Sequence, residues 1–118
     1  MDAAAFALPC LAVQAVTELK FFSVADVLYF SFDARRRTWR LHTADGQELP
    51  LRKALRAADI AAVCPLFVPI AQGCLVNVLY VAAIEHGTQC RLRPPFGDVR
   101  LAVSRRMMPG LRDRFPML

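Results

Sequence analysis

The amino-acid sequence predicts a mainly β, antiparallel domain with one central amphipathic helix and a short C-terminal helix. Several short segments alternate apolar with polar residues, which is the period of a half-buried strand. Turn-forming residues separate these segments, and Asp45-Gly46 is the strongest of these turn signals. Helical spacing of apolar residues is confined to residues 52–63 and 107–115. Strands are therefore expected to dominate the fold.

Length and composition limit the class of protein. The 118 residues suit one domain with a modest core, and we expect a flexible leader at residues 1–10 and a single domain at residues 11–118. A hydrophobic content of 56% excludes a disordered chain, and polar residues interrupt the apolar stretches before the length that a membrane span needs. No signal-peptide pattern opens the chain, and the four cysteines lack paired spacing. We therefore expect reduced, buried cysteines in a cytoplasmic protein.

Two strands and a basic loop are predicted in the first half of the chain. Residues 27–32 alternate, with Phe30 facing the side opposite to Val27. Residues 33–37 form a polar loop that contains three arginines. Residues 38–43 alternate again, and the side chains on their apolar face are Trp39 and Leu41.

A hairpin is predicted next. Ala44-Asp45-Gly46-Gln47 indicates a tight turn, because Asp-Gly supplies the positive φ angles of a type I′ turn. The returning strand covers residues 48–51. Pro50 lacks an N–H donor, so this strand is expected at an edge of the sheet.

The remaining elements follow in order. Apolar residues at helical spacing predict a helix over residues 52–63, and Pro50 and Pro65 bracket it. Short strands are then expected at residues 66–70, 74–77 and 82–86, with a turn at 78–80. Two more follow at 88–93 and 99–104, separated by a proline-rich turn, and a short helix over 107–115 ends the chain.

Positive charge gathers in two segments. Residues 34–56 and residues 88–118 each hold seven basic and two acidic residues, so each carries +5. The intervening residues 57–87 hold only two acidic residues. A folded chain could bring both segments onto one face as a footprint for a polyanion. Arginine supplies 13 of the 15 basic residues, which suits bidentate phosphate and guanine contacts, although a GC-rich genome also favours arginine.

Enzyme chemistry has little support in the sequence. The only histidines are His42 and His86, and neither has a neighbouring nucleophile signature. No Cys-x-x-Cys pair suggests zinc, and the five glycines are isolated turn residues rather than a phosphate loop. We therefore predict no catalytic residue, no metal, no cofactor and no small-molecule substrate.

A family resemblance rests on the order of several short motifs. These are Val27-Leu28-Tyr29, Asp45-Gly46, Leu55, Phe67, Leu75-Val76-Asn77, Ile84, Val103-Ser104-Arg105-Arg106 and Leu111. In this order they resemble the LytTR DNA-binding domain over residues 11–115. The resemblance implies a β fold that inserts loop side chains into successive major grooves of duplex DNA, commonly at direct repeats. A homodimer on DNA and a signalling or membrane partner protein are further partners left open.

One segment departs from the family pattern. LytTR domains usually carry a basic segment of the type arginine-valine-histidine-arginine-serine before the Leu-Val-Asn motif, whereas this chain has Pro69-Ile70-Ala71-Gln72-Gly73. Within it, only Gln72 could read a base, by pairing with adenine. The family also often places a receiver domain ahead of this one. Here only residues 1–10 precede the domain, so we expect the input signal to come from elsewhere.

The residues predicted to bind DNA are Arg35, Arg36, Arg37, Arg40, Gln72, Arg105 and Arg106. Arg105 and Arg106 follow a strand expected to end at Ser104, and such rigid placement suits base reading. A flexible loop at residues 35–37 suits phosphate contact, or is simply a solvated loop. Asn77 is expected to be structural. The predicted function is a small transcriptional regulator. The alternative is a LytTR-like protein-interaction module that modulates another regulator, which the uncharged residues 69–73 favour.

Overall fold

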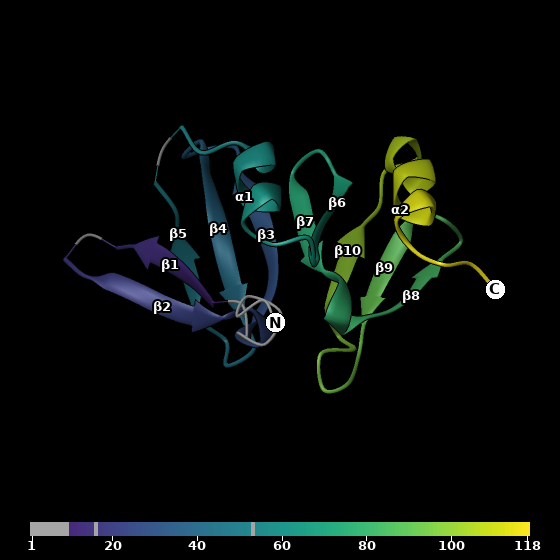
Figure 1. The fold of residues 1–118 in the computed structure, drawn as a ribbon, viewed down its shortest axis with the longest axis horizontal. Coiled ribbons are helices and arrows are strands. Elements are labelled where there is room, and N and C mark those ends of the chain that lie inside the picture. The colour runs from purple at the N-terminus through teal and green to yellow at the C-terminus, as the bar shows by residue number, and fades with distance from the viewer. Residues whose placement is uncertain (1–9, 16, 53) are drawn as a thin grey trace, which may run out of the picture.

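The computed structural model describes residues 10–15, 17–52 and 54–118, and strands dominate it (Figure 1). Strands make up 44% and helices 21% of the structure, which confirms the predicted mainly β fold. The strands are β1 (Cys10–Gln14), β2 (Leu19–Ser23), β3 (Val27–Asp33), β4 (Thr38–Thr43), β5 (Glu48–Pro50), β6 (Phe67–Ala71), β7 (Cys74–Asn77), β8 (Val81–Glu85), β9 (Gln89–Leu92) and β10 (Arg100–Ala102). The α-helices are α1 (Ala57–Val63) and α2 (Met108–Arg114), and the 3₁₀ turns are η2 (Val24–Asp26), η3 (Val78–Tyr80) and η4 (Arg105–Met107).

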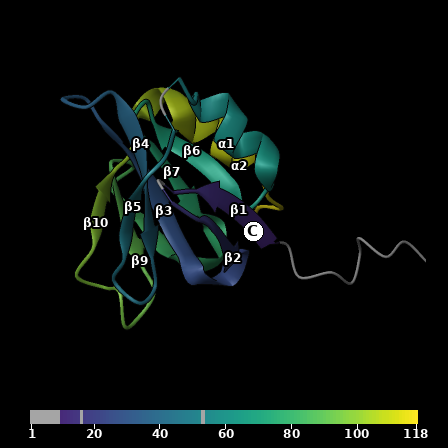
Figure 2. The same cartoon turned by 90° about the vertical axis from the view of Figure 1, so that its left-hand side faces the viewer.

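The strands form three antiparallel sheets. The largest has the order β5-β4-β3-β7-β6, and the two smaller ones are β1-β2 and β10-β9-β8. Strand β5 lies at an edge, as Pro50 predicted. The hairpin β1-β2 and helix α1 lie on the same side of β3 and β4 (Figure 2).

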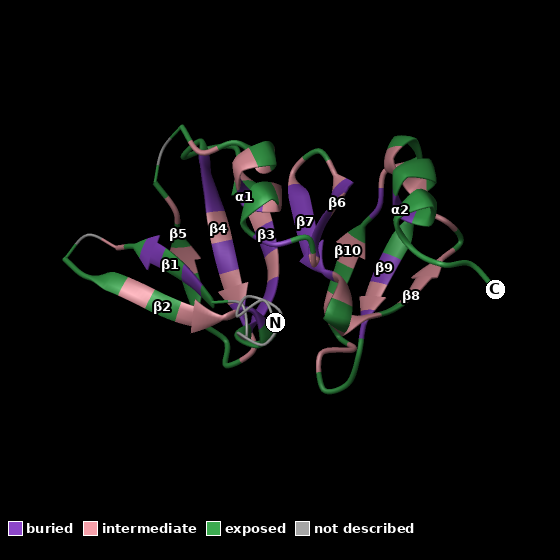
Figure 3. Ribbon diagram, viewed as in Figure 1, coloured by how far each residue is buried: buried purple, intermediate pink, exposed green. Residues whose placement is uncertain are grey.

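Two apolar cores share strand β7. The first core lies between the large sheet, the β1-β2 hairpin and α1, and Phe30 packs edge-on against Phe67 there with ring centroids 5.0 Å apart. The second core lies between β6, β7, the sheet β8 to β10 and α2, and Leu92 is fully buried in it. All four residues of β7 are buried (Figure 3). Leu75 packs in the first core and Val76 in the second, because successive strand residues point to opposite faces.

The alternation predicted for β4 is confirmed, and that for β3 is partly wrong. Trp39 and Leu41 are buried in the first core, as expected. Val27, however, lies in the same core as Phe30. In a regular strand, residues that are three positions apart in sequence would face opposite sides. A register shift between Val27 and Tyr29 in the pairing with β4 explains this, since an extra residue in a strand reverses the later facing.

Strands β1 and β2 were not predicted from the sequence. Leu11 and Val13 are buried, and Cys10, Ala12 and Gln14 are exposed. Burial therefore alternates as in a half-buried strand, but Cys10 and Ala12 are apolar too, so the sequence itself does not alternate. Most of the predicted leader, residues 1–9, lies outside the described residues, and β1 begins at Cys10.

The predicted start of the central helix is wrong. The helix was expected to begin at residue 52, but α1 begins at Ala57. Ala54 has a φ angle of 67°, which an α-helix cannot contain. Arg56 is extended, and its backbone N–H donates to the Asp59 carboxylate over 2.8 Å, which fixes the first turn.

The β4-β5 hairpin is present, but its turn type differs from the prediction. Gly46 has a φ angle of 87°, whereas Asp45 is not among the described residues with positive φ, so the turn is not type I′. The Thr43 N–H donates to the Gln47 carbonyl over 3.0 Å, which closes a three-residue loop with glycine at the left-handed position. None of the described helices is long and apolar enough to cross a membrane.

Candidate nucleic-acid interface

Three chain connections meet at one end of the molecule, the upper end in Figure 1. They are the β3-β4 loop (residues 34–37), the β6-β7 turn (residues 72–73) and the start of η4 (residues 104–106), and together we call them the basic end. Strands β3 and β7 pair antiparallel, and the Phe32 N–H donates to the Gly73 carbonyl over 3.0 Å. The Ser104 N–H donates to the Ile70 carbonyl over 2.7 Å. These bonds fix each connection beside the next.

The β3-β4 loop is a constrained turn. The Asp33 carboxylate accepts hydrogen bonds from the backbone N–H groups of Arg35, at 3.0 Å, and of Arg36, at 3.2 Å. Arg37 has a φ angle of 55°, the left-handed conformation that closes the loop. All three arginines are exposed. The loop expected to be flexible is therefore held by the residue that precedes it.

Arg40 differs from the other predicted arginines. It lies within β4, on the face opposite the first core, rather than in a connection. Its guanidinium pairs with Glu48 over 2.5 Å and with Asp33 over 3.9 Å, and its side chain is only 19% exposed. These two carboxylates neutralise its charge and join β4 to its neighbours on either side.

The β6-β7 turn contains Gln72, the predicted base reader. Ala71 pairs with Cys74, so Gln72 and Gly73 form the turn. Gln72 is exposed, whereas Ile70 is buried in the second core. Since the other residues of this segment carry no polar side chain, Gln72 alone can offer side-chain hydrogen bonds from this turn.

The arginines at η4 are held by a short cap. The Ser104 hydroxyl accepts from the Arg106 N–H over 3.3 Å, and the Met107 N–H donates to the Ser104 carbonyl over 3.0 Å. The predicted strand end at Ser104 is wrong, because β10 ends at Ala102 and Ser104 caps the 3₁₀ turn that begins at Arg105. Arg105 and Arg106 are both exposed. Their backbone is thus anchored to β6, next to the β6-β7 turn.

The charges of the basic end are mostly uncompensated. Within the described residues, Arg35, Arg37, Arg105 and Arg106 form no ion pair, and Arg36 pairs with Asp33 only at 3.8 Å. Exposed cations of this kind attract a polyanion. The same described residues contain no cluster of three or more histidine, cysteine, aspartate or glutamate side chains that could hold a metal ion.

A polar cluster lies on the same sheet face as Arg40. The His42 ring stacks on Tyr29 with centroids 4.1 Å apart, and its Nε2 lies 2.7 Å from the Ser31 hydroxyl. Burial lowers the pKa of His42 below its ordinary value, against the opposing effect of Glu48. Burial also raises the pKa of Tyr29. His42 is therefore fixed in the sheet and favoured in its neutral form.

The comparison with protein families gives the affiliation of the chain. The model of the LytTR DNA-binding domain matches residues 17–115. The chain belongs to the LytTR family. No curated protein matches the chain at a significant level.

The fold also resembles a solved LytTR structure. That structure is described as a LytTr DNA-binding domain from Bacillus cereus. The two chains share 14% sequence identity with a TM-score of 0.68, over 89% of this chain and 94% of the other. The resemblance inferred from short motifs is thus confirmed by both the family match and the fold.

Two further exposed arginines of this LytTR domain were not among the residues predicted to bind DNA. Arg52 and Arg56 are exposed and lie in the connection between β5 and α1, which runs along the same end of the molecule as the β3-β4 loop (Figure 1). The signal for them was present, since both belong to the basic segment at residues 34–56. Their inclusion in a predicted helix concealed it.

The asparagine of the Leu75-Val76-Asn77 motif is structural, as expected. Asn77 is fully buried and donates from its amide nitrogen to the carbonyls of Val24 and Val27, both over 2.9 Å. Its amide oxygen accepts from the Leu79 N–H over 3.1 Å. It joins η2 to η3, two segments that are far apart in the sequence, and its buried side chain cannot contact DNA.

Proposed function

We propose that this LytTR domain is a sequence-specific, duplex-DNA-binding transcriptional regulator that places its basic end in the major groove. The observation that carries the proposal is the juxtaposition of three connections, two of them arginine-rich, at one end of the molecule. Four of their arginines carry charge without an internal counter-ion in the described part of the chain. Such an arrangement can contact both the phosphates of duplex DNA and the base edges in the groove between them.

The three connections divide the work of recognition. Arg105 and Arg106 stand on a backbone bonded to β6, and rigid placement favours bidentate hydrogen bonds to guanine. Gln72 lies next to them and is suited to adenine. Residues 35–37 contact phosphates at the neighbouring groove, while Arg40 supports that loop from β4. Two copies bind adjacent direct repeats in the cytoplasm, under the control of a signalling or membrane partner.

The proposal can be tested by titrating a fluorescent duplex of mixed sequence and measuring its anisotropy over a series of salt concentrations. Each phosphate contact adds about 0.9 to the slope of log affinity against log salt. We expect steep salt dependence for the wild type, and weaker binding with a lower slope for the double variant Arg105→Ala/Arg106→Ala. The matched control is Arg112→Ala/Arg114→Ala, which removes two exposed arginines from the last turn of α2.

The alternative is a protein-interaction module that has lost DNA binding. The observation in its favour is the β6-β7 turn, where Gln72 stands alone in place of the basic family segment. The same titration separates the two. No binding to any duplex at low salt would reject the regulator and favour the interaction module.

A further inference from the structure

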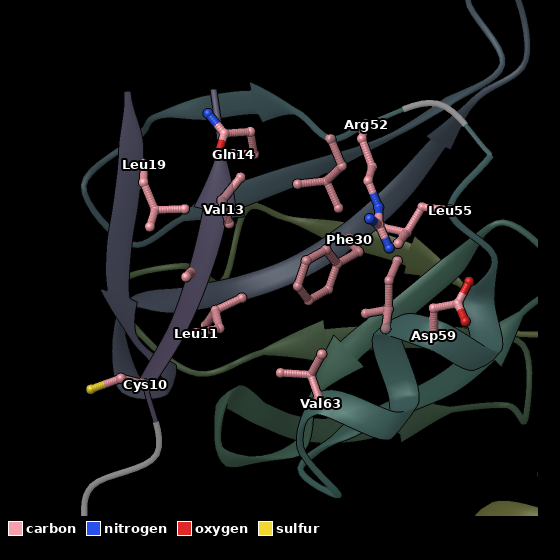
Figure 4. Close-up of a pocket in the computed structure, with 13 residues that line it drawn as sticks. Cys10, Leu11, Val13, Gln14, Leu19, Phe30, Arg52, Leu55, Asp59 and Val63 are labelled. Carbon is pink, nitrogen blue, oxygen red and sulfur yellow. The ribbon is translucent and has the colours of Figure 1, made fainter. Parts of the chain in front are cut away.

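A hollow lies between the β1-β2 hairpin and helix α1, and none of the residues predicted to bind DNA lines it (Figure 4). Its volume is about 490 Å³, which is within the range of small-molecule sites. Apolar side chains supply most of its wall. Those labelled in the figure are Leu11, Val13, Leu19, Phe30, Leu55 and Val63.

Few polar groups face this hollow, and two of them are already engaged. The Gln14 amide donates to the backbone carbonyls of its own turn, at Ala15 over 2.9 Å and Glu18 over 3.4 Å. The Asp59 carboxylate accepts from the Arg56 N–H over 2.8 Å, and the Arg56 guanidinium lies 3.6 Å from it. Neither group is available as the main partner of a ligand.

Arg52 is the polar group left over. It interacts electrostatically with Asp59, but within the described residues it forms no ion pair. Figure 4 shows its guanidinium reaching over the hollow, between Phe30 and Leu55. An apolar wall with one cation at its rim that forms no ion pair in the described residues is complementary to an apolar body with one anionic head.

We propose that this hollow binds a small amphipathic carboxylic acid, with its hydrocarbon chain against Leu11, Phe30 and Leu55 and its carboxylate on Arg52. Burying each methylene group strengthens binding about fourfold, so affinity rises with chain length while the hollow has room. The guanidinium offers two parallel N–H donors, which fit a carboxylate. None of the residues predicted to bind DNA lines the hollow, and the proposal does not depend on DNA binding.

The test is calorimetric titration of the full chain with decanoate, kept below its micelle concentration, and with decanol and decylamine at the same chain length. We expect decanoate to bind more tightly than either, and more tightly than octanoate. Arg52→Gln should weaken decanoate about tenfold and leave decanol unchanged, since only the charged hydrogen bonds are lost. Val63→Trp should weaken both, because Val63 is exposed at the edge of the hollow and a larger side chain there obstructs it.

The control is Arg114→Gln, an exposed arginine at the end of α2 that does not line the hollow. It should bind all ligands as the wild type does. Thermal melts of each variant establish that it is folded before titration. Equal affinity for decanoate and decanol, equal affinity of the wild type and Arg52→Gln for decanoate, or no binding of decanoate to the wild type would each overturn the proposal.

Discussion

Asn77 illustrates how one buried side chain joins distant parts of the chain. Its amide satisfies two carbonyls near η2 and one N–H in η3, all in a fully buried position. Buried backbone carbonyls need hydrogen-bond donors, and no water reaches a group with no exposed surface. The asparagine therefore determines where the two segments meet, although neither is a regular strand or helix.

Asn77→Ala should lower the free energy of unfolding by roughly 2–4 kcal/mol, because a fully buried side chain loses three hydrogen bonds, two to the carbonyls of Val24 and Val27 and one from the Leu79 N–H. Urea unfolding followed by circular dichroism measures this. Gln72→Ala is the control, since an exposed turn residue should change stability by less than about 0.5 kcal/mol. Equal effects of the two substitutions would show that the buried bonds of Asn77 contribute nothing net.

Arg105 and Arg36 should have different roles in DNA recognition. Arg105 stands on the capped turn that is bonded to β6, and Arg36 lies in a loop where Asp33 competes for its charge. Arg105→Ala should lower affinity for the preferred site by about 1–3 kcal/mol and relax the preference at one base pair. Arg36→Ala should weaken binding to every DNA sequence by about the same amount, and that amount should be smaller than the loss caused by Arg105→Ala at its preferred site. Selection from randomised duplexes measures both, and an unchanged preference for Arg105→Ala beside an altered one for Arg36→Ala would reverse the assignment.

His42 should make stability depend on pH. Burial places its pKa in the folded chain below the ordinary value of 6.5. Below that value the unfolded chain binds the proton more readily, so the stability present above pH 6.5 is lost as the pH falls through the folded pKa. Urea unfolding should therefore give lower stability at about pH 5.5 than at about pH 7.5. The loss should be smaller in His42→Gln, and equal losses in both proteins would contradict the role of this side chain.

At the scale of elements, the sequence predicted strands better than their connections. Alternation identified β3 and β4, because a strand with one buried face repeats every two residues. Alternation did not predict the bulge in β3 or the start of α1. Each depends on a local backbone conformation that apolar periodicity does not encode, and the positive φ of Ala54 is an example. Strands β1 and β2 escaped because apolar residues also occupy their exposed positions, at Cys10 and Ala12 in β1 and at Leu19 and Phe21 in β2.

The candidate site was predictable in its residues and not in its arrangement. Arginine-rich segments are visible in the sequence, but it is the pairing of β3 with β7 and the bond from Ser104 to Ile70 that bring them to one end. These contacts join residues far apart in the chain. For the same reason, the sequence did not reveal that Arg40 forms ion pairs with Asp33 and Glu48. Nor did it reveal that Arg52 lies at the rim of an apolar hollow.

Two glycines in different elements should respond oppositely to alanine. Gly46 has a φ of 87° at the β4-β5 turn, and alanine there is strained even though space is open, so Gly46→Ala should cost about 1 kcal/mol. Gly110 lies inside α2 with open space around it, so Gly110→Ala should add about 0.5–1 kcal/mol by reducing the freedom of the unfolded chain. Thermal or urea unfolding of both variants measures the pair. A change of the same sign in both would contradict the backbone argument.

At the scale of the whole molecule, the position of β7 matters most. Leu75 faces the first core and Val76 the second, so one four-residue strand belongs to both. Strand β6 is divided in the same way, with Phe67 in the first core and Ile70 in the second. Loss of either core would expose one face of these two strands to water. The two cores should therefore unfold together, as expected of a single domain.

A substitution in the second core tests this coupling. Leu92 is fully buried there, and Leu92→Ala should cost about 2–5 kcal/mol through lost burial and a residual cavity. Trp39, the only tryptophan, lies in the first core, so its fluorescence reports that core alone. If β6 and β7 couple the cores, the urea midpoint of Trp39 fluorescence should fall in the variant, together with the midpoint from circular dichroism. A fluorescence transition that keeps its wild-type midpoint while the dichroism transition moves would mean that the two cores unfold independently.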